Sequence, residues 1–257
     1  MIDSHTHLDN ERFTEDIDEA VARAIASGVD RFIIPATSDD AQAHLFETVS
    51  RYSHCMYATA GLHPTDVNDN PDFREHLKNV AKVVAAPPMR IVAIGETGTD
   101  LHWGGDFIAE QMESFEFQVR LSIEHNLPLI IHTRDSWNET FEVLESYAGK
   151  ARGVLHSFSG TAKEIERIER LTGFYYGING TVTYKNSTLP EALQSIPVEK
   201  ILLETDSPFL PPTPYRGKRN ESSYIPLIAA KVAEIKGIST TQLAEIATKN
   251  TERLFNL

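Results

Sequence analysis

Two histidines separated by one residue, His5 and His7, are the first residues of the chain whose types and spacing could do chemistry. They end a short stretch, residues 1–7, that is expected to form the first β-strand. Because side chains of a strand alternate between its faces, His5 and His7 point the same way and could both bind one metal ion. Asp3 lies on the same face and could fix the tautomer of a ring nitrogen that binds no metal. Alone, the pair is equally compatible with two incidental surface histidines.

Further potential metal ligands stand at the ends of later β-rich stretches: Glu96, His132, His156 and Asp206. His63 stands at another such end. Imidazole and carboxylate ligands held on strands suit zinc, manganese or similar divalent ions. Each residue singly has an ordinary structural explanation, such as a hydrogen-bonded core histidine or a salt-bridged carboxylate. Four histidines and two carboxylates are too many for one tetrahedral site with an open position. They match two ions that share a bridging carboxylate.

Eight β-rich stretches, separated by helical ones, must position these residues. The strands are expected at 1–7, 31–38, 56–63, 90–97, 128–134, 153–159, 174–183 and 200–207. Helical periodicity occurs between them and again after the last strand, notably at 16–27, 108–124, 138–147, 162–171, 189–196, 224–236 and 239–249. Strand then helix, repeated eight times, predicts a single (β/α)8 TIM barrel with C-terminal helices. The Gly-rich dinucleotide fingerprint does not follow the first strand, which disfavours a Rossmann fold.

The composition agrees with one domain spanning residues 1–257. Of its residues, 41% are hydrophobic and 24% are charged, and the single cysteine excludes an internal disulfide. Neither a secretory signal nor an apolar run near 18 residues is present, so we expect a cytoplasmic protein without membrane contact. The net charge of −13 argues against a broad nonspecific nucleic-acid surface. A polyanionic substrate would need local help from metals or a basic loop.

In their order along the chain, these motifs resemble those of the TatD family of metal-dependent deoxyribonucleases, a branch of the amidohydrolase-like hydrolases. The motifs are H-x-H, G-x-H-P, G-E-x-G-x-D, H-x-R, H-x-F-S-G and E-T-D-S-P-x-L. The resemblance implies a first metal with the ligands His5, His7, Glu96 and Asp206. It implies a second metal with the ligands Glu96, His132 and His156, so that Glu96 bridges the two. In the same pattern His63 lines the substrate pocket.

The activity implied by the resemblance is hydrolysis of phosphodiester bonds in DNA by a hydroxide activated by two divalent metals, Mg, Mn or Zn. Asp206, Glu96 and His63 are the candidate catalytic residues, and Asp206 is expected to orient the water or take its proton. A narrow site favours exonucleolytic trimming of strand ends. The same scaffold could instead hydrolyse another small ester, amide or phosphoester. A non-catalytic metal-binding or partner-binding protein is the third possibility, and no obligate protein partner is evident.

Substrate binding is predicted for five residues in or near the loops at the expected barrel mouth: Arg134, Trp103, Arg216, Lys218 and Arg219. Loops near the last strands of such barrels often bind phosphate, and the arginine fork fits a phosphate group. The basic triplet could equally be a solvated surface turn. Trp103 could stack on a base or cover the end of a helix.

Overall fold

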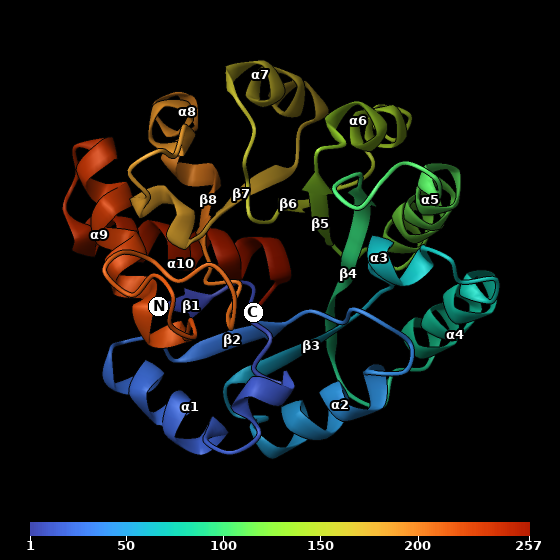
Figure 1. Cartoon of the computed structure of the whole chain (residues 1–257), viewed down its shortest axis with the longest axis horizontal. Coiled ribbons are helices and arrows are strands. Elements are labelled where there is room, and N and C mark those ends of the chain that lie inside the picture. Colours follow the sequence, from blue (N-terminus) through green and yellow to red (C-terminus); the bar gives the residue numbers. More distant parts are fainter.

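Eight parallel strands follow one another in chain order around a barrel in this computed structural model, which describes residues 1–257 (Figure 1). They are β1 (Ile2–Asp3), β2 (Arg31–Ile34), β3 (Met56–Ala60), β4 (Ile91–Asp100), β5 (Leu129–Arg134), β6 (Gly153–Leu155), β7 (Phe174–Ile178) and β8 (Ile201–Leu203). The barrel closes where the Ser4 amide donates to the Leu203 carbonyl at 3.0 Å and Thr6 bridges to Ser207. The predicted TIM barrel is therefore confirmed.

Helices surround the barrel and connect successive strands (Figure 1). They are α1 (Ile17–Ala26), α2 (Gln42–Arg51), α3 (Pro64–Val67), α4 (Phe73–Ala85), α5 (Ile108–Glu124), α6 (Trp137–Glu145), α7 (Ala162–Leu171), α8 (Leu189–Ser195), α9 (Ile225–Lys236) and α10 (Thr240–Phe255). Short 3-10 turns lie at Glu11–Phe13, Gly180–Thr183, Val198–Lys200 and Ser222–Tyr224. The seven predicted helices are all present, whereas α2, α3 and α4 were not predicted individually.

The strands end earlier than the apolar pattern predicts, except for β4 and β5. The regular strand β1 ends at Asp3 and only a single bridge follows it, at Thr6, although Ser4, His5 and Thr6 are fully buried. A buried segment has the same sequence pattern whether or not its backbone belongs to a ladder, so the pattern overestimates strand length. His5 and His7 consequently lie just beyond the strand, at the mouth of the barrel.

The interior of the barrel is apolar toward the N-terminal ends of the strands. A cluster of buried side chains fills it there: Ile33, Val92, Ala93, Ile130, Val154, Leu202, Leu254 and Phe255. Leu254 and Phe255 come from α10, whose last turn closes this end of the barrel. A larger apolar cluster packs the strands against the surrounding helices.

The same interior becomes polar toward the C-terminal ends of the strands. Side chains two positions apart on a strand share a face. His132 therefore follows Ile130 into the interior, and His156 follows Val154 in the same way. Strand alternation thus stacks a layer of titratable side chains on the apolar layer, at the end where such barrels carry their active sites.

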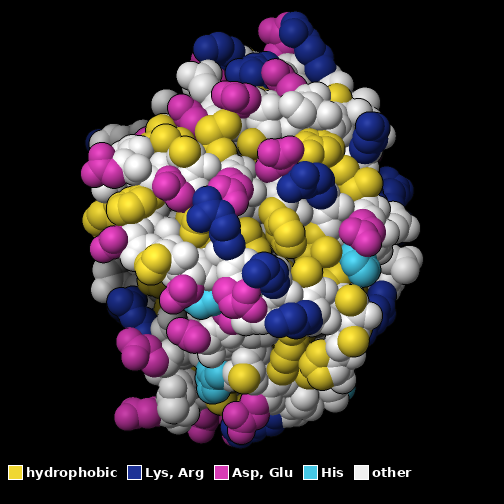
Figure 2. All heavy atoms as spheres, turned by 90° about the vertical axis from the view of Figure 1, so that its right-hand side faces the viewer, with side chains coloured by type: hydrophobic (Ala, Val, Ile, Leu, Met, Phe, Trp, Pro, Cys, Tyr) yellow, Lys and Arg dark blue, Asp and Glu magenta, His cyan; other side chains and the backbone are white.

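The outer flank formed by α4 and α5 is an ordinary charged surface. Acidic and basic side chains are interspersed over it (Figure 2). Arg74 of α4 and Glu113 of α5, for example, form a two-pronged ion pair at 2.6 Å. None of the helices combines the length and the apolar character needed to cross a membrane.

Leu254→Ala should destabilise the protein by about 2–5 kcal/mol, because this side chain is only 3% exposed and its loss leaves a void in the closed end of the barrel. Ile25→Ala on the outer face of α1, where the side chain is 45% exposed, is the control and should cost about 1 kcal/mol or less. Urea unfolding of both variants measures the difference. Equal losses would show that α10 does not close the core.

Candidate metal centre

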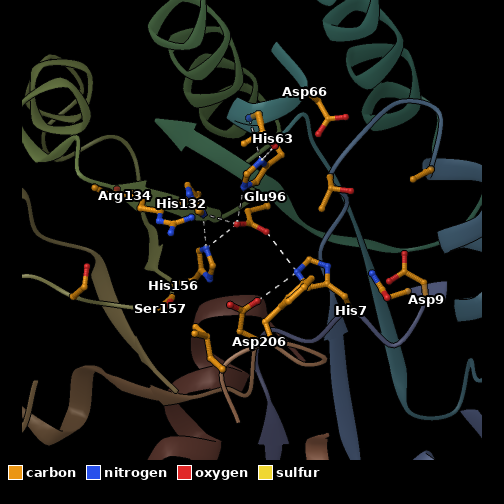
Figure 3. A pocket seen from close by; sticks show the side chains of 18 of the residues that line it. His7, Asp9, His63, Asp66, Glu96, His132, Arg134, His156, Ser157 and Asp206 are labelled. Carbon is orange, nitrogen blue, oxygen red and sulfur yellow. Dashed lines mark hydrogen bonds and ion pairs between the residues drawn. The ribbon is translucent and has the colours of Figure 1, made fainter. Parts of the chain in front are cut away.

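The carboxylate of Glu96 lies at the centre of the polar layer, and one of its oxygens faces the N-terminal histidines (Figure 3). Glu96 Oε2 is 3.3 Å from His5 Nε2 and 3.8 Å from His7 Nε2. Asp206 Oδ1 lies 3.7 and 3.6 Å from the same two nitrogens, which are themselves 3.2 Å apart. Ligands of a tetrahedral zinc ion are roughly 3.3 Å apart, given bonds of about 2.0 Å. This donor set therefore fits one divalent cation.

The other oxygen of Glu96 faces a second group of imidazoles, from β5 and from the segments that follow β6 and β3. Glu96 Oε1 is 2.7 Å from His156 Nε2, 2.9 Å from His132 Nδ1 and 3.3 Å from His63 Nε2. The His132 and His156 nitrogens are 3.2 Å apart. The donor spacing again fits a divalent cation, and the two oxygens of Glu96 face the two groups. His63, expected to line the pocket, also points a ring nitrogen into the cluster.

Asp100, the last residue of β4, holds His132 from behind. Its Oδ2 lies 2.9 Å from His132 Nε2, so the other ring nitrogen, Nδ1, faces Glu96. Carboxylates in this position fix the ring orientation and tautomer of a metal-binding histidine. Asp100 ends the G-E-x-G-x-D motif, but no role was assigned to it from the sequence. The position of Asp100 on the same strand as Glu96, four residues later, was the sequence feature that could have identified this role.

Glu204 is a second carboxylate that sequence reasoning left without a role. It is completely buried and accepts a hydrogen bond from the Ser157 amide, while its Oε1 lies 3.8 Å from His156 Nδ1. Its Oε2 has no partner, and a Cβ at Gly177 would come within 2.2 Å of that oxygen. Burial raises the pKa of Glu204 well above its usual range, and nearby carboxylates add to this shift. Glycine at 177 thus makes room for a buried acid behind His156.

Asp3 does not contact an imidazole, so the expected tautomer-fixing role is wrong. Its carboxylate accepts hydrogen bonds from the Thr205 amide at 2.9 Å and the Thr205 hydroxyl at 2.6 Å, and from the His5 amide at 3.4 Å. The side chain turns toward the segment after β8, where the Thr205 amide and hydroxyl are its donors. Asp3 therefore ties β1 to β8 and fixes the backbone that carries His5.

Opposite charges shift the pKa values of the cluster in the metal-free protein. Burial disfavours the charged form of His7, yet Asp206 and Glu96 raise its pKa to about 9. Against the same burial effect, Asp100 and Glu96 raise the pKa of His132 to about 9. Burial and the neighbouring His156 lower the pKa of His5 to about 4. Burial opposes ionisation of Glu96 too, but the surrounding histidines hold its pKa well below the usual range.

A cavity of about 780 Å³ opens over the cluster, and Arg134 is its only lysine or arginine. Trp103 does not line the cavity; it is 70% exposed, and its ring lies 5.8 Å from the Arg134 guanidinium. Phe209 also lines the cavity, is 44% exposed and lies 6.2 Å from the His7 ring. No role was predicted for Phe209 from the sequence, because a phenylalanine at the variable position of E-T-D-S-P-x-L is typical of an ordinary buried apolar residue.

The basic triplet of the loop after β8 does not line this cavity. Arg219 forms a two-pronged ion pair with Asp16 at 2.6 and 2.7 Å. Arg216 stacks 4.4 Å from the Tyr184 ring centre, and the Lys218 ammonium lies 5.7 Å from that of Tyr215. The structure thus brings Arg134 to the six predicted metal ligands but keeps the triplet apart from them.

Comparison with known proteins identifies the family. The family model described as TatD related DNase matches residues 2–256. The chain belongs to this family. YabD of Bacillus subtilis, named an uncharacterized metal-dependent hydrolase, is 37% identical over 259 residues, which cover 100% of this chain and 99% of YabD. TatD of Citrobacter rodentium, named a 3'-5' ssDNA/RNA exonuclease, is 35% identical, with 100% and 98% coverage.

The crystal structure of the TatD homologue YjjV from Escherichia coli has the same fold, with a TM-score of 0.92. It is 30% identical and covers 100% of this chain and 98% of YjjV. The predicted resemblance is confirmed, and this TatD-family protein is a metal-dependent hydrolase that acts on ester bonds. Its His/Glu/Asp cluster is able to bind metal.

Asp100→Asn should weaken metal binding by about 10–100-fold, because an amide holds the His132 ring in place less well than a carboxylate. Asp135→Asn is the matched control, since Asp135 is exposed and contacts His102, which is no ligand. Competition with a chromogenic chelator measures both affinities. Unchanged affinity in Asp100→Asn would refute the positioning role.

Proposed function

We propose that this TatD-family hydrolase is a divalent-metal-dependent deoxyribonuclease that trims the ends of DNA strands. The observation that carries the proposal is Glu96, whose two oxygens face two different groups of imidazoles. Such a carboxylate suits a pair of cations, and cation pairs are common in enzymes that cleave phosphodiesters. The name of the Citrobacter relative, a 3'-5' ssDNA/RNA exonuclease, supports the substrate class and the preference for strand ends.

In this proposal the first cation is held by His5, His7, Glu96 and Asp206. The second is held by Glu96, His132 and His156. When bound, the two divalent cations, Mg, Mn or Zn, would activate a water and neutralise charge on the phosphate. Glu96 would supply an anion to both cation sites and would reduce the repulsion between the cations.

Asp206 and His63 both line the cavity. Asp206 is proposed to act on the attacking water, and His63 on the phosphate. Asp206 lines the cavity, and the histidines lower its pKa against the effect of burial, so it is ionised and orients the attacking water or takes its proton. Burial lowers the pKa of His63, which leaves it neutral at pH 7. Its Nδ1 is 2.7 Å from the Thr65 hydroxyl, so Nε2 is the nitrogen presented to the cavity side.

Arg134 is proposed to hold the phosphate next to the scissile bond, because it is the sole guanidinium on the cavity. Trp103 beside it would stack on the adjacent base. Arg216 and Lys218 would meet phosphates further along the strand, outside the cavity. Arg219 is the weakest contact of the set, because a phosphate would have to displace Asp16. A cavity of this size holds a small molecule or one nucleotide, which favours strand ends over duplex interiors.

One observation favours a second candidate, a hydrolase for a small ester, amide or phosphoester. Asp9 and Asp66 line the cavity, whereas Arg134 is its only cation apart from histidines. An acidic wall repels a polyanion until cations bind, but it admits a neutral or singly charged substrate.

The decisive experiment incubates the protein, after metal loading, with end-labelled single-stranded DNA, RNA and duplex, and in parallel with neutral esters. The expected product is a ladder shortened one nucleotide at a time from DNA ends, abolished by chelation and restored by manganese or magnesium. Turnover of small esters alone would establish the second candidate instead.

Glu96→Gln should lose more activity than His132→Ala or His156→Ala, because the two oxygens of Glu96 face both groups of imidazoles.

These three variants should keep the circular dichroism of the parent, which separates loss of chemistry from loss of fold. If Glu96→Gln retains two cations at parental affinity and near-normal turnover, Glu96 is a structural carboxylate and no bridge.

Arg134→Gln should raise KM for oligonucleotides by about tenfold, equivalent to one lost charge-assisted hydrogen bond. Arg216→Gln with Lys218→Gln should raise KM less and only for longer strands, because both side chains lie outside the cavity. Steady-state kinetics on strands of two and ten nucleotides separate the two effects. A larger loss from the double variant on dinucleotides would reverse this assignment.

A further inference from the structure

A second cavity lies at the opposite end of the barrel from the metal ligands. Its volume is about 360 Å³, and three of its lining residues are Arg90, Arg152 and Arg253. Arg90 directly precedes β4, Arg152 directly precedes β6, and Arg253 is in the last turn of α10. No aspartate or glutamate lines this cavity. The three arginines give this cavity a local positive charge in a chain of net charge −13.

The three arginines differ from most others in lacking a carboxylate partner. Half of the fourteen arginines form ion pairs with aspartate or glutamate: Arg23, Arg31, Arg51, Arg74, Arg167, Arg170 and Arg219. Arg90, Arg152 and Arg253 form no such pair within 4.0 Å. Guanidinium groups gathered without a counter-charge repel one another, and an anion among them would relieve that repulsion.

Two of the guanidinium groups are anchored so that donors remain free. Arg152 Nη2 donates to the Asn126 carbonyl at 2.8 Å, while its Nη1 is buried without a partner. Arg90 Nη2 donates to the Asn256 carbonyl. An unsatisfied buried donor is uncommon in proteins, because leaving it unpaired is unfavourable. The free Nη1 of Arg152 therefore indicates an acceptor that completes the site.

We propose that this cavity binds a small organic phosphate, with its phosphate group held by Arg90, Arg152 and Arg253. Three guanidinium groups match the double negative charge and several oxygens of a phosphate monoester better than a single carboxylate. The binding does not depend on the nuclease assignment, because this cavity shares no residue with the metal centre.

The remainder of the cavity indicates an organic substituent rather than bare phosphate. Its other walls include the apolar residues Ile91, Leu127, Pro128 and Phe255, close to the position where α10 closes the barrel. The volume falls in the range of small-molecule sites and far exceeds the space that a single ion needs. A ligand with a phosphate at one end and an apolar or aromatic group at the other would contact both kinds of wall.

Calorimetric titration of the metal-loaded protein with benzylphosphonate, which a hydrolase cannot cleave at its carbon–phosphorus bond, tests the proposal. Inorganic phosphate and phenylacetate are the comparison ligands. Arg90→Gln with Arg253→Gln should weaken benzylphosphonate binding at least about tenfold. Arg120→Gln, which removes another exposed arginine without a carboxylate partner, should leave it unchanged. The titrations use protein without a C-terminal tag, because Asn256 lines the cavity.

The parent protein and the arginine variants all retain the metal centre. Ligand binding at that centre therefore cannot produce a difference between their affinities. Equal affinities in the parent and the double variant would overturn the proposal. If phenylacetate binds as tightly as benzylphosphonate, the site does not select a phosphate group over a carboxylate. If inorganic phosphate binds as tightly, the ligand needs no organic substituent. Either result would overturn the proposal. Arg152→Met should also lose binding, with thermal unfolding used to verify that the half-buried position still folds.

Discussion

A buried carboxylate surrounded by imidazoles is the constraint on which the functional end of this barrel depends. Glu96 is 3% exposed, and five histidines have ring nitrogens 2.7–3.8 Å from its oxygens. An ionised group so far from water is stable only when positive charge surrounds it. Protonated histidines can supply that charge in the metal-free protein, and divalent cations can replace the protons. The acid at the centre therefore makes the cluster a place for metals.

Three further carboxylates support this centre without lining the cavity above it. Asp100 orients His132, Asp3 ties β1 to the segment after β8, and Glu204 lies behind His156. Each acts on the position of an imidazole or of the backbone that carries one. A metal site that tolerates little movement needs such support, because ligand distances must be kept within a few tenths of an ångström.

The two ends of the barrel serve different purposes although the same strands build both. Toward the N-terminal ends the interior is apolar and is closed by Leu254 and Phe255 of α10. Toward the C-terminal ends the alternation of strand side chains brings His132 and His156 into the same interior. The stabilising layer thus lies directly beneath the reactive one, so the ligands stand on a rigid base.

The sequence by itself determined the (β/α)8 barrel, the TatD family and the set of histidines and carboxylates at the mouth, because strand periodicity and ordered motifs are local patterns. Only the tertiary structure decided that Asp100 faces His132 and that Asp3 binds Thr205 instead of an imidazole. It also paired Arg219 with Asp16, 203 positions away, and gathered Arg90, Arg152 and Arg253 around one cavity. These outcomes depend on side-chain directions and on contacts between segments remote in the chain. Spacing along a strand predicts the face on which a side chain lies, but not the residue of another segment that it contacts.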